Sequence, residues 1–453
     1  MTSIWWIKRD LRLDDNAALG AASADGPVVP VFVVDPIFLK HSGIPRLQFL
    51  YGTLRELDAR MGGALVIRVG DPATEIAAVA QAVGAKTVFA HRDFVPYGQS
   101  RDIKVAAALQ SIGVHFVGAD SPYVVDPGTI RKDDGTPVRV FTPFFKRWQQ
   151  VSWNSSLSYV PQWSNTTSLS VALPEIATTE AVLPGVGQGA ARERWNEWSS
   201  HGLEEYKEAR NMPGVDGTSM MSPYLRFGVV HPRQLISDLP GHSGADVFRS
   251  EIAWREFYAD VLFHRPDSMW KNLQTKMDIL PVDTDAAAQQ RFAAWCEART
   301  GYPIVDAGIR QMLAIGWMHN RVRMIVASFL VKDLHVPWQW GARFFMKHLV
   351  DGDIASNNHG WQWTAGTGTD AAPYFRVFNP VLQGEKFDPD GNFVCAWIPE
   401  LRDVPKKFVH APWLQSDRGL FAQYPEPMVD HSQERDEALS RYKISGEINR
   451  SVV

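Results

Sequence analysis

The spacing of apolar residues divides the chain into two parts. In the first part, short apolar runs rich in β-branched residues alternate with amphipathic segments such as residues 73–83. Continuous apolar runs of this length are typical of strands that helices cover on both faces. The pattern therefore predicts a parallel α/β sheet of the Rossmann-like kind. The expected strands are residues 3–7, 28–34, 64–69, 86–90 and 114–117.

Further along the chain the periodicity becomes helical. Residues 246–263, 304–317 and 319–334 repeat apolar positions every three or four residues, and no alternating strand pattern interrupts them. Residues 153–191 are rich in Ser, Thr, Pro and Gly with weak periodicity, which is typical of an interdomain connection. We therefore expect an α/β domain over residues 1–130, a linker over 131–191 and an all-helical domain over 192–453.

Composition narrows the class of protein. The chain has 453 residues, a formal net charge of −4 and only two cysteines, which are too few for a disulfide framework or a cysteine metal site. No apolar run approaches the roughly 18 residues that a membrane span needs, and the N-terminus lacks the long apolar segment of a signal peptide. We expect a cytoplasmic protein with no metal and no membrane association. A net negative charge leaves nucleic-acid binding to a local basic patch.

Dense groups of mixed polar residues recur in the helical part. They are "DGTSMMSPYLRFG" (216–228), "EIAWREFY" (251–258), "GWMHNRVRM" (316–324) and "DGDIASNNHGWQW" (351–363). Taken singly, each group has an ordinary structural interpretation: Thr218 and Ser219 as helix caps, and Arg255 with Glu256 as a solvated ion pair. Four such groups in one helical domain favour a polar pocket for a large ligand with many polar atoms.

These groups carry a resemblance to a known family. Together with "WWIKRDLRLDDNAAL" (5–19), "TGYPIVDAGIRQM" (300–312) and the continuation of the last group to "FNPVLQGEKFD" (378–388), they follow one another as in the photolyase/cryptochrome family. The chain most resembles bacterial cyclobutane pyrimidine dimer DNA photolyases. The resemblance implies an N-terminal antenna domain and a helical domain that binds FAD. It also implies repair of pyrimidine dimers by electron transfer from light-excited reduced FAD.

The resemblance implies a set of FAD-binding residues. Hydroxyl and backbone N–H groups at a helix start suit the phosphates. Arg323 and Asp351 match an ion pair beside the flavin ring, where the charge of the arginine favours the anionic reduced form. Asn357, the first amide of "NNHG", matches the residue that faces flavin N5, where an amide can accept a hydrogen bond but cannot act as an acid. The implied residues are Tyr206, Thr218, Ser219, Met220, Met221, Ser222, Trp317, Arg323, Asp351, Gly352, Asp353 and Asn357.

Another implied set of residues binds damaged DNA. Photolyases flip the damaged bases out of the duplex, and Trp254 and Trp363 match two indoles that hold the lesion between them. Glu251 matches a carboxylate that hydrogen-bonds a thymine carbonyl. Asn320 and Met324 stand where enzymes for the (6-4) photoproduct have histidines, and neither can donate a proton, so we expect a cyclobutane-dimer enzyme. Expected at the DNA backbone are Arg210, Arg255, Arg321 and Gln383, and the implied catalytic residues are Glu251, Asn320, Met324 and Asn357.

Two tryptophans match the family's photoreduction chain, and two positions depart from the family pattern. Trp361 matches the tryptophan nearest the flavin and Trp338 the middle one. Asp285 stands where bacterial enzymes place the outer tryptophan, so Trp295, Trp340 or a tyrosine must replace it as electron carrier. His359 replaces a usual glycine, either as a structural residue or as a proton source, and we favour the structural role.

Other classes of function remain open at the level of sequence. One alternative is a cryptochrome-like blue-light photoreceptor with bound FAD and little or no repair activity. Another is a DNA-binding protein whose flavin is vestigial. The set of Glu251, Trp254, Asn320, Met324 and Trp363 favours repair. We expect a monomer that binds damaged DNA and no protein partner. A second, antenna chromophore of folate or deazaflavin type is compatible with the sequence, which does not identify it.

Overall fold

The computed structural model describes residues 2–153, 158–164, 166–369 and 376–451. The chain forms two compact units, which do not follow the order of the sequence. Unit 1 comprises Met1–Thr179, Leu183–Ser200 and Ser219–Pro266, and unit 2 comprises Glu180–Val182, His201–Thr218 and Asp267–Val453. Sequence neighbours such as Thr218 and Ser219 therefore belong to different units.

A five-stranded parallel sheet forms the centre of unit 1. Its strands are β1 (Ser3–Ile7), β2 (Val28–Val34), β3 (Val66–Val69), β4 (Thr87–Ala90) and β5 (His115–Gly118), in the order β3-β2-β1-β4-β5. The predicted sheet is confirmed, and each strand lies within two residues of its expected bounds. The agreement has a physical reason, because β1 and β2 are buried along their whole length and read as continuous apolar runs.

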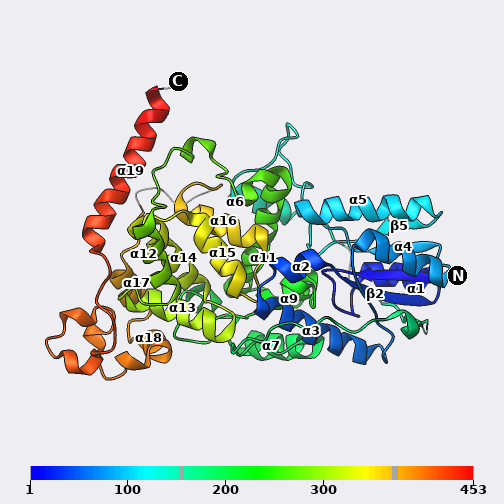
Figure 1. The fold of residues 1–453 in the computed structure, drawn as a ribbon, viewed down its shortest axis with the longest axis horizontal. Helices are drawn as coiled ribbons and strands as arrows, with labels where there is room; N and C mark the ends of the chain where they lie inside the picture. Colours follow the sequence, from blue (N-terminus) through cyan, green and yellow to red (C-terminus); the bar gives the residue numbers. More distant parts are fainter. Residues whose placement is uncertain (1, 154–157, 165, 370–375, 452–453) are drawn as a thin grey trace. The chain divides into compact units, whose positions relative to one another are not determined.

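Helices cover both faces of the sheet. Crossovers between parallel strands are right-handed, so α1 (Ala17–Asp25) and α3 (Ile44–Arg60) lie on one face and α4 (Pro72–Val83) and α5 (Pro96–Ser111) on the other (Figure 1). The short α2 (Pro36–His41) follows β2. From β1 the chain adds β2 and β3 on one side of the sheet and then β4 and β5 on the other. This change of direction between β1 and β4 is the arrangement of a doubly wound fold.

Unit 1 also contains helices from beyond the sheet. They are α6 (Phe141–Trp148), α7 (Gly187–His201, with His201 in unit 2), α9 (Ser222–Phe227), α10 (Pro232–Ser237) and α11 (Ser243–His264). Helix α6 lies within the stretch expected to be a linker and packs against α11. Buried Glu256 of α11 accepts hydrogen bonds from Val124 N (2.5 Å), Val125 N (3.0 Å) and Trp148 Nε1 (2.7 Å). These three bonds hold α6 and the preceding loop on α11.

Unit 2 is helical, as expected, and its described part contains no strand. Its helices are α8 (Tyr206–Ala209), α12 (Ala286–Cys296), α13 (Pro303–Ile315), α14 (Asn320–Ser328), α15 (Trp338–His348), α16 (Ile354–Ala365), α17 (Pro380–Phe387), α18 (Asn392–Trp397) and α19 (His431–Ser451). A π-helical turn, η4 (Phe329–Asp333), follows α14. Within the described ranges, no helix is both long and apolar enough to cross a membrane.

The core of unit 2 depends on close packing between α13, α14, α15 and α16. Helix α15 approaches α16 at Gly341, where an added Cβ atom would lie 2.1 Å from Cη2 of Trp361. Helix α13 approaches α14 at Gly308, where an added Cβ would lie 2.3 Å from Cγ1 of Val322. Any side chain larger than hydrogen at these two positions would push the helices apart.

One glycine in unit 1 combines a left-handed backbone with a close approach. Gly228 ends α9 at φ 63°, and an added Cβ would lie 1.8 Å from the carbonyl oxygen of Arg9. We predict that Gly228→Ala lowers the free energy of unfolding by the roughly 1–2 kcal/mol of a left-handed alanine plus about 1–3 kcal/mol for the displaced carbonyl. Urea unfolding followed by circular dichroism measures the change.

Gly84 provides a matched control for this prediction. It ends α4 at φ 62°, but nothing lies within 4 Å of its added Cβ. Gly84→Ala should therefore show only the left-handed backbone term. Equal losses in the two variants would contradict the close approach of α9 to the end of β1.

Candidate functional site

Helices α14 and α16 together carry seven of the predicted site residues of unit 2, and they pack against each other. Helix α14 begins after His319, whose Nδ1 accepts from Arg321 N (3.1 Å). Helix α16 begins after Asp353, whose carboxylate accepts from Ala355 N (3.1 Å) and Ser356 N (3.2 Å). Asp353, predicted as a FAD-binding residue, thus also caps the helix that carries Asn357, Trp361 and Trp363.

Arg323 and Asp351 form an ion pair, as expected from the sequence. Arg323 Nη2 lies 2.8 Å from Asp351 Oδ2, and Arg323 Nε donates to the carbonyl oxygen of Met318 (2.7 Å). The Asp351 side chain is only 3% exposed, while that of Arg323 is 26% exposed. The guanidinium also lies 5.9 Å from the ring centroid of Trp317, another predicted FAD contact. The pair is therefore present, and its role beside a flavin stays a prediction.

The side-chain amide of Asn357 has a defined orientation. Its Nδ2 donates to the carbonyl oxygen of Ala342 (3.1 Å) and to Asn358 Oδ1 (2.8 Å), which uses both amide hydrogens. Asn358 is fully buried and donates in turn to the carbonyl oxygen of Met269. The atom of Asn357 that is left for a ligand is therefore Oδ1, a hydrogen-bond acceptor.

The contacts of His359 fit the structural role expected of it. It is buried, its Nδ1 donates to the carbonyl oxygen of Ala355 (2.9 Å), and its Nε2 lies 2.9 Å from Ser268 Oγ. Because Nδ1 carries the hydrogen, Nε2 of the neutral ring accepts from the serine hydroxyl. Burial lowers the pKa of His359 to about 4, so the ring stays neutral and is a poor proton source near pH 7.

The indole of Trp361 lies in an aromatic cluster. Its ring centroid is 6.2 Å from that of Trp295 and 5.0 Å from that of Phe345. The Trp295 ring is 5.7 Å from Phe292, which is 5.3 Å from the half-buried Trp340. A chain of aromatic contacts thus leads from Trp361 through Trp295 to Trp340.

The other two positions of the expected tryptophan chain have different surroundings. Trp338 is buried and donates from Nε1 to Asn272 Oδ1 (2.9 Å). Asp285, which stands where relatives place the outer tryptophan, caps α12 by accepting from Ala288 N (2.8 Å). A helix cap explains an aspartate at this position.

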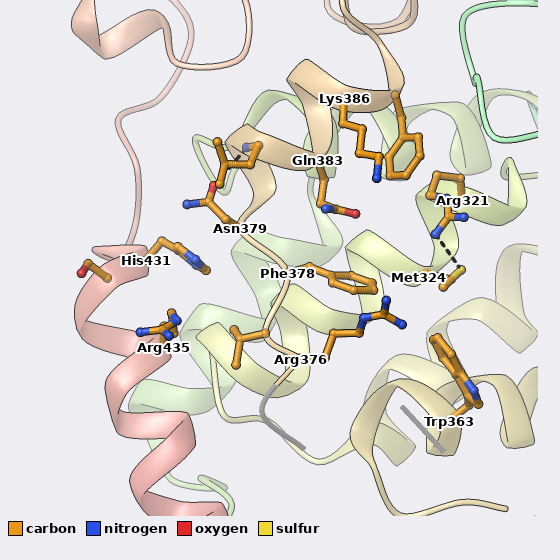
Figure 2. Close-up of a pocket in the computed structure, with 14 residues that line it drawn as sticks. Arg321, Met324, Trp363, Arg376, Phe378, Asn379, Gln383, Lys386, His431 and Arg435 are labelled. Atoms are coloured by element: carbon orange, nitrogen blue, oxygen red, sulfur yellow. Dashed lines mark hydrogen bonds between the residues drawn. The ribbon is translucent and has the colours of Figure 1, made fainter. Parts of the chain in front are cut away.

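A groove of about 780 Å³ in unit 2 brings together several residues that were predicted to bind the lesion or DNA (Figure 2). Arg321, Met324, Trp363 and Gln383 all line it, although they come from three helices. Asn320 is exposed and is not among the lining residues. Its role in binding the lesion stays a prediction.

Sequence reasoning missed other residues of this groove. They lie after residue 375, and five of them fall within the motif at 378–388, from which only Gln383 was assigned to DNA. Clustered Arg, Lys and aromatic residues are a recognisable signal for nucleic-acid binding. The missed lining residues are Arg376, Val377, Phe378, Asn379, Leu382, Lys386, Phe387, His431, Ser432 and Arg435.

Several cations surround Arg321, which lines the groove. Arg321 donates to Asn211 Oδ1 (2.6 Å) and lies 4.4 Å from the ring centroid of Phe387. Burial lowers its pKa, and the charges of Arg210 and Arg376 lower it further. Burial, with Arg321, Arg323 and Arg210, lowers the pKa of His319 to about 3. Cations that lower one another's pKa favour the binding of an anion.

In unit 1, α11 carries Glu251, Trp254 and Arg255 on one face, because they are spaced three and four residues apart. One face of the Trp254 ring stacks on Phe141 of α6, with centroids 3.7 Å apart. Arg255 donates to the carbonyl oxygens of Pro122 (2.9 Å) and Leu225 (3.2 Å). The interpretation of Arg255 and Glu256 as a solvated pair is therefore wrong, since Glu256 is buried and has other partners.

The segment before α9 has the backbone of an anion-binding nest. Met220 is left-handed at φ 53°, and Met221 follows in the right-handed helical region. When a residue with a left-handed backbone is followed by one with a right-handed backbone, their N–H groups point to the same side, which suits a phosphate. Ser219 Oγ accepts from Met221 N (3.3 Å), and neither Thr218 nor Ser219 caps α9, so that interpretation is wrong. Ser222 is the exposed first residue of the helix.

The remaining predicted residues lie in unit 2. Tyr206 is buried at the start of α8, and the guanidinium of Arg210 lies 5.7 Å from its ring centroid. Thr218 is half-buried, and Gly352 lies buried between Asp351 and Asp353. Their contacts with a cofactor or with DNA stay predictions.

Comparison with known proteins identifies the class of this fold and site. The model of the FAD-binding domain of DNA photolyase matches residues 248–444, and the DNA photolyase model matches residues 3–162. The chain is thus a flavoprotein with an N-terminal α/β domain and a helical FAD-binding domain. It belongs to the photolyase/cryptochrome family.

Individual relatives extend over nearly the whole chain. Deoxyribodipyrimidine photo-lyases of Vibrio cholerae and Escherichia coli are 38% and 37% identical to it, over 97% and 98% of this chain and 99% of their own. A solved class III photolyase of Agrobacterium tumefaciens has a TM-score of 0.88 at 34% identity, with 98% of each chain covered. A solved cryptochrome of Synechocystis has a TM-score of 0.87 at 27% identity, over 97% of this chain and 98% of its own.

The residues present fit a bound FAD. Two buried ring N–H groups, Nε2 of His319 and Nε1 of Trp361, have no hydrogen-bond partner among the described residues, and a ligand rich in acceptors would satisfy such donors. Asn357 Oδ1, in the same unit, suits a ring N–H.

The surroundings of His359 predict a pH-dependent contribution to stability. Its pKa is about 4 in the folded chain and about 6.5 in an unfolded one, so unfolding takes up a proton between these values. The stabilisation from the neutral ring is present above pH 6.5 and is lost as pH falls toward 4. We predict that His359→Asn reduces the slope of unfolding free energy against pH in this window by up to about 1.4 kcal/mol per pH unit.

Urea unfolding at a series of pH values measures this slope. The exposed His115 of β5, replaced by Asn, is the control, because burial cannot act on it. An unchanged slope in His359→Asn would show that the ring takes up a proton as readily in the folded protein as in the unfolded chain.

Proposed function

We propose that the protein is a light-dependent DNA photolyase that repairs cyclobutane pyrimidine dimers. The observation that supports this most is the groove of unit 2, where Arg321, Met324, Trp363 and Gln383, each assigned to lesion or DNA binding from the sequence, share one surface. The relatives with 38% and 37% identity carry the name of this activity. Reduced FAD, when bound, would supply the electron that splits the dimer after it absorbs light.

The residues of unit 2 would prepare the flavin site electrostatically. Arg323 is held in place by Asp351 and by the carbonyl oxygen of Met318, so its charge lies at a fixed position and favours an anionic form of the cofactor. Asn357 offers only Oδ1, which accepts a hydrogen bond and cannot deliver a proton. His359 is neutral and bonded on both sides. None of these side chains is an acid that would protonate an anionic flavin ring.

Other residues would hold the flipped dimer. The half-buried Trp363 offers a stacking surface worth about 1–3 kcal/mol per base, and Met324 lies beside it in the groove. Neither Met324 nor Asn320 can act as an acid, which suits a cyclobutane dimer because its cleavage needs an electron and no added proton. Glu251 would hydrogen-bond a base carbonyl in its protonated form, and Trp254 would present the ring face that Phe141 leaves open.

A cryptochrome-like photoreceptor is the second candidate, because the solved Synechocystis cryptochrome matches the fold as closely as the photolyase does. One experiment separates the two. Anaerobically reduced holoprotein is mixed with dimer-containing DNA and held under blue light or in the dark. Loss of dimers only in the light supports repair, and intact dimers in both arms support the photoreceptor.

The role proposed for Glu251 of α11 leads to a prediction about repair. Glu251→Ala should lower the number of dimers repaired per absorbed photon several-fold, because a hydrogen bond to the lesion is lost, while FAD stays bound. Dimer repair under calibrated light and the flavin absorbance of the purified protein measure the two effects. Asp246→Ala on the same helix, where the side chain is 70% exposed, is the control. Repair by Glu251→Ala at the level of this control would exclude the assigned role.

Two routes of photoreduction start at Trp361: one through Trp338, expected from the sequence, and one through Trp295, which the aromatic cluster indicates. With a thiol as the external reductant, light should no longer reduce oxidised FAD in Trp361→Phe, because every route begins with its indole. Trp338→Phe should slow the reduction strongly. Trp295→Phe should also slow it relative to the wild type, since the Trp295 ring lies 6.2 Å from that of Trp361. Flavin absorbance during illumination measures each rate.

Two controls accompany these variants. Trp153→Phe, in unit 1, should leave photoreduction unchanged. All variants should still repair dimers when the flavin is reduced chemically beforehand, because the repair electron travels to the lesion. Photoreduction at the wild-type rate in Trp361→Phe would mean that the tryptophans have only packing roles.

A further inference from the structure

The groove in unit 2 continues beyond the residues that the proposed function uses. Trp363, Met324 and Arg321 lie at one end, and Arg435 and His431 of α19 lie at the opposite end (Figure 2). Arg376 and Phe378 lie between the two ends. The first two turns of the C-terminal helix therefore form a far wall, which no step in holding the dimer requires.

The positive charge of the groove favours an anionic ligand. Four side chains with fixed positive charge line it, Arg321, Arg376, Lys386 and Arg435, and none of its lining residues is an acid. Arg376 contributes to the lowered pKa of Arg321, so the cations act on one another and an anion would relieve them. Aromatic side chains lie between these charges. Alternating cationic and aromatic groups fit a single nucleic-acid strand, which offers phosphates and ring faces in turn.

The far wall is held rigidly. His431 Nδ1 lies 2.5 Å from Asp333 Oδ1, and His335 Nε2 lies 2.8 Å from Glu434 Oε2. Tyr442 donates from its hydroxyl to the carbonyl oxygen of Ala365 (2.5 Å), so α19 is bonded to the end of α16. A wall that needs no ordering on binding loses less entropy when it takes up a ligand.

A buried lysine supports the middle of the groove. Lys332 of η4 is 1% exposed, and its Nζ donates to the carbonyl oxygen of Arg376 (2.8 Å). The buried lysine thus holds the backbone of Arg376 by a hydrogen bond, while the Arg376 side chain is exposed. Arg435 pairs with its exposed neighbour Asp436 at 3.0 Å, and such a surface pair contributes little and exchanges readily for a phosphate.

We propose that the far end of the groove binds the backbone of the damaged strand next to the dimer, with Arg435 and Arg376 each contacting a phosphate. The inference rests on the proposed function for the position of the dimer at Trp363. A volume of about 780 Å³ is far larger than one phosphate needs, which favours a strand over a single small anion. Helix α19 then acts as a DNA-binding element that sets how much flanking strand the protein recognises.

The test uses the full-length holoprotein in the dark and three single-stranded oligonucleotides. Each contains one cyclobutane dimer, with flanking nucleotides on both sides, on the 5′ side only or on the 3′ side only. In the wild type, removal of one of the two flanks should weaken binding much more than removal of the other. Arg435→Gln should bind the fully flanked oligonucleotide more weakly and should be insensitive to removal of that same flank. Its slope of log affinity against log salt should fall by about 0.7, the value for one phosphate of a single strand.

Lys443→Gln is the matched control, because it makes the same change of charge on the same helix at an exposed residue outside the groove. Thermal unfolding of both variants checks that the fold is kept. The proposal is overturned if Arg435→Gln behaves like Lys443→Gln, or if it weakens all three oligonucleotides equally.

An undamaged oligonucleotide separates this inference from the proposed function. If the wild type does not prefer the dimer and does not repair it in light, the proposed function fails. The far end can still be judged in that case, because Arg435→Gln should also lower the salt slope on the undamaged strand. A normal light-dependent repair together with an unchanged slope in Arg435→Gln would overturn the role of α19 alone.

Discussion

The contact between α15 and α16 at Gly341 constrains the whole helical unit. The missing side chain lets the backbone of α15 reach the ring of Trp361, and the next residue, Ala342, accepts a hydrogen bond from Asn357. One helix contact therefore fixes both the indole that starts the aromatic chain and the amide that presents an acceptor. Because protein interiors are close-packed, a small displacement at this contact would move both groups together.

The architecture was predictable because its signals are local. Strands such as β1 and β2 are buried on both faces, so each one reads as an apolar run whose ends coincide with the strand ends. Helix α6 was missed because it is short and stands in a stretch without regular periodicity. Its position depends on Glu256, more than 100 residues away in the sequence, which accepts from Trp148. Contacts over such distances leave no pattern in a single sequence.

In the candidate site, too, residues within sequence motifs were predictable, and contacts between distant segments were not. Asn357 and the pair of Arg323 with Asp351 were predictable from motifs that resemble a family, and the structure gives their geometry. The groove was predictable only in part, because Arg321, Arg376 and Arg435 lie on separate segments that meet only in the folded chain. Asp285 illustrates the converse: its departure from the family pattern was visible in the sequence, but its function as a helix cap was not.

The bond between Tyr442 and Ala365 has a mechanical consequence. It joins the helix at the far wall of the groove to the last turn of the helix that carries Asn357 and Trp361. A displacement of α19 would therefore also act on the end of α16 through this bond. A load on α19 would then reach the last turn of α16 at Ala365 through a single hydrogen bond, two residues beyond Trp363.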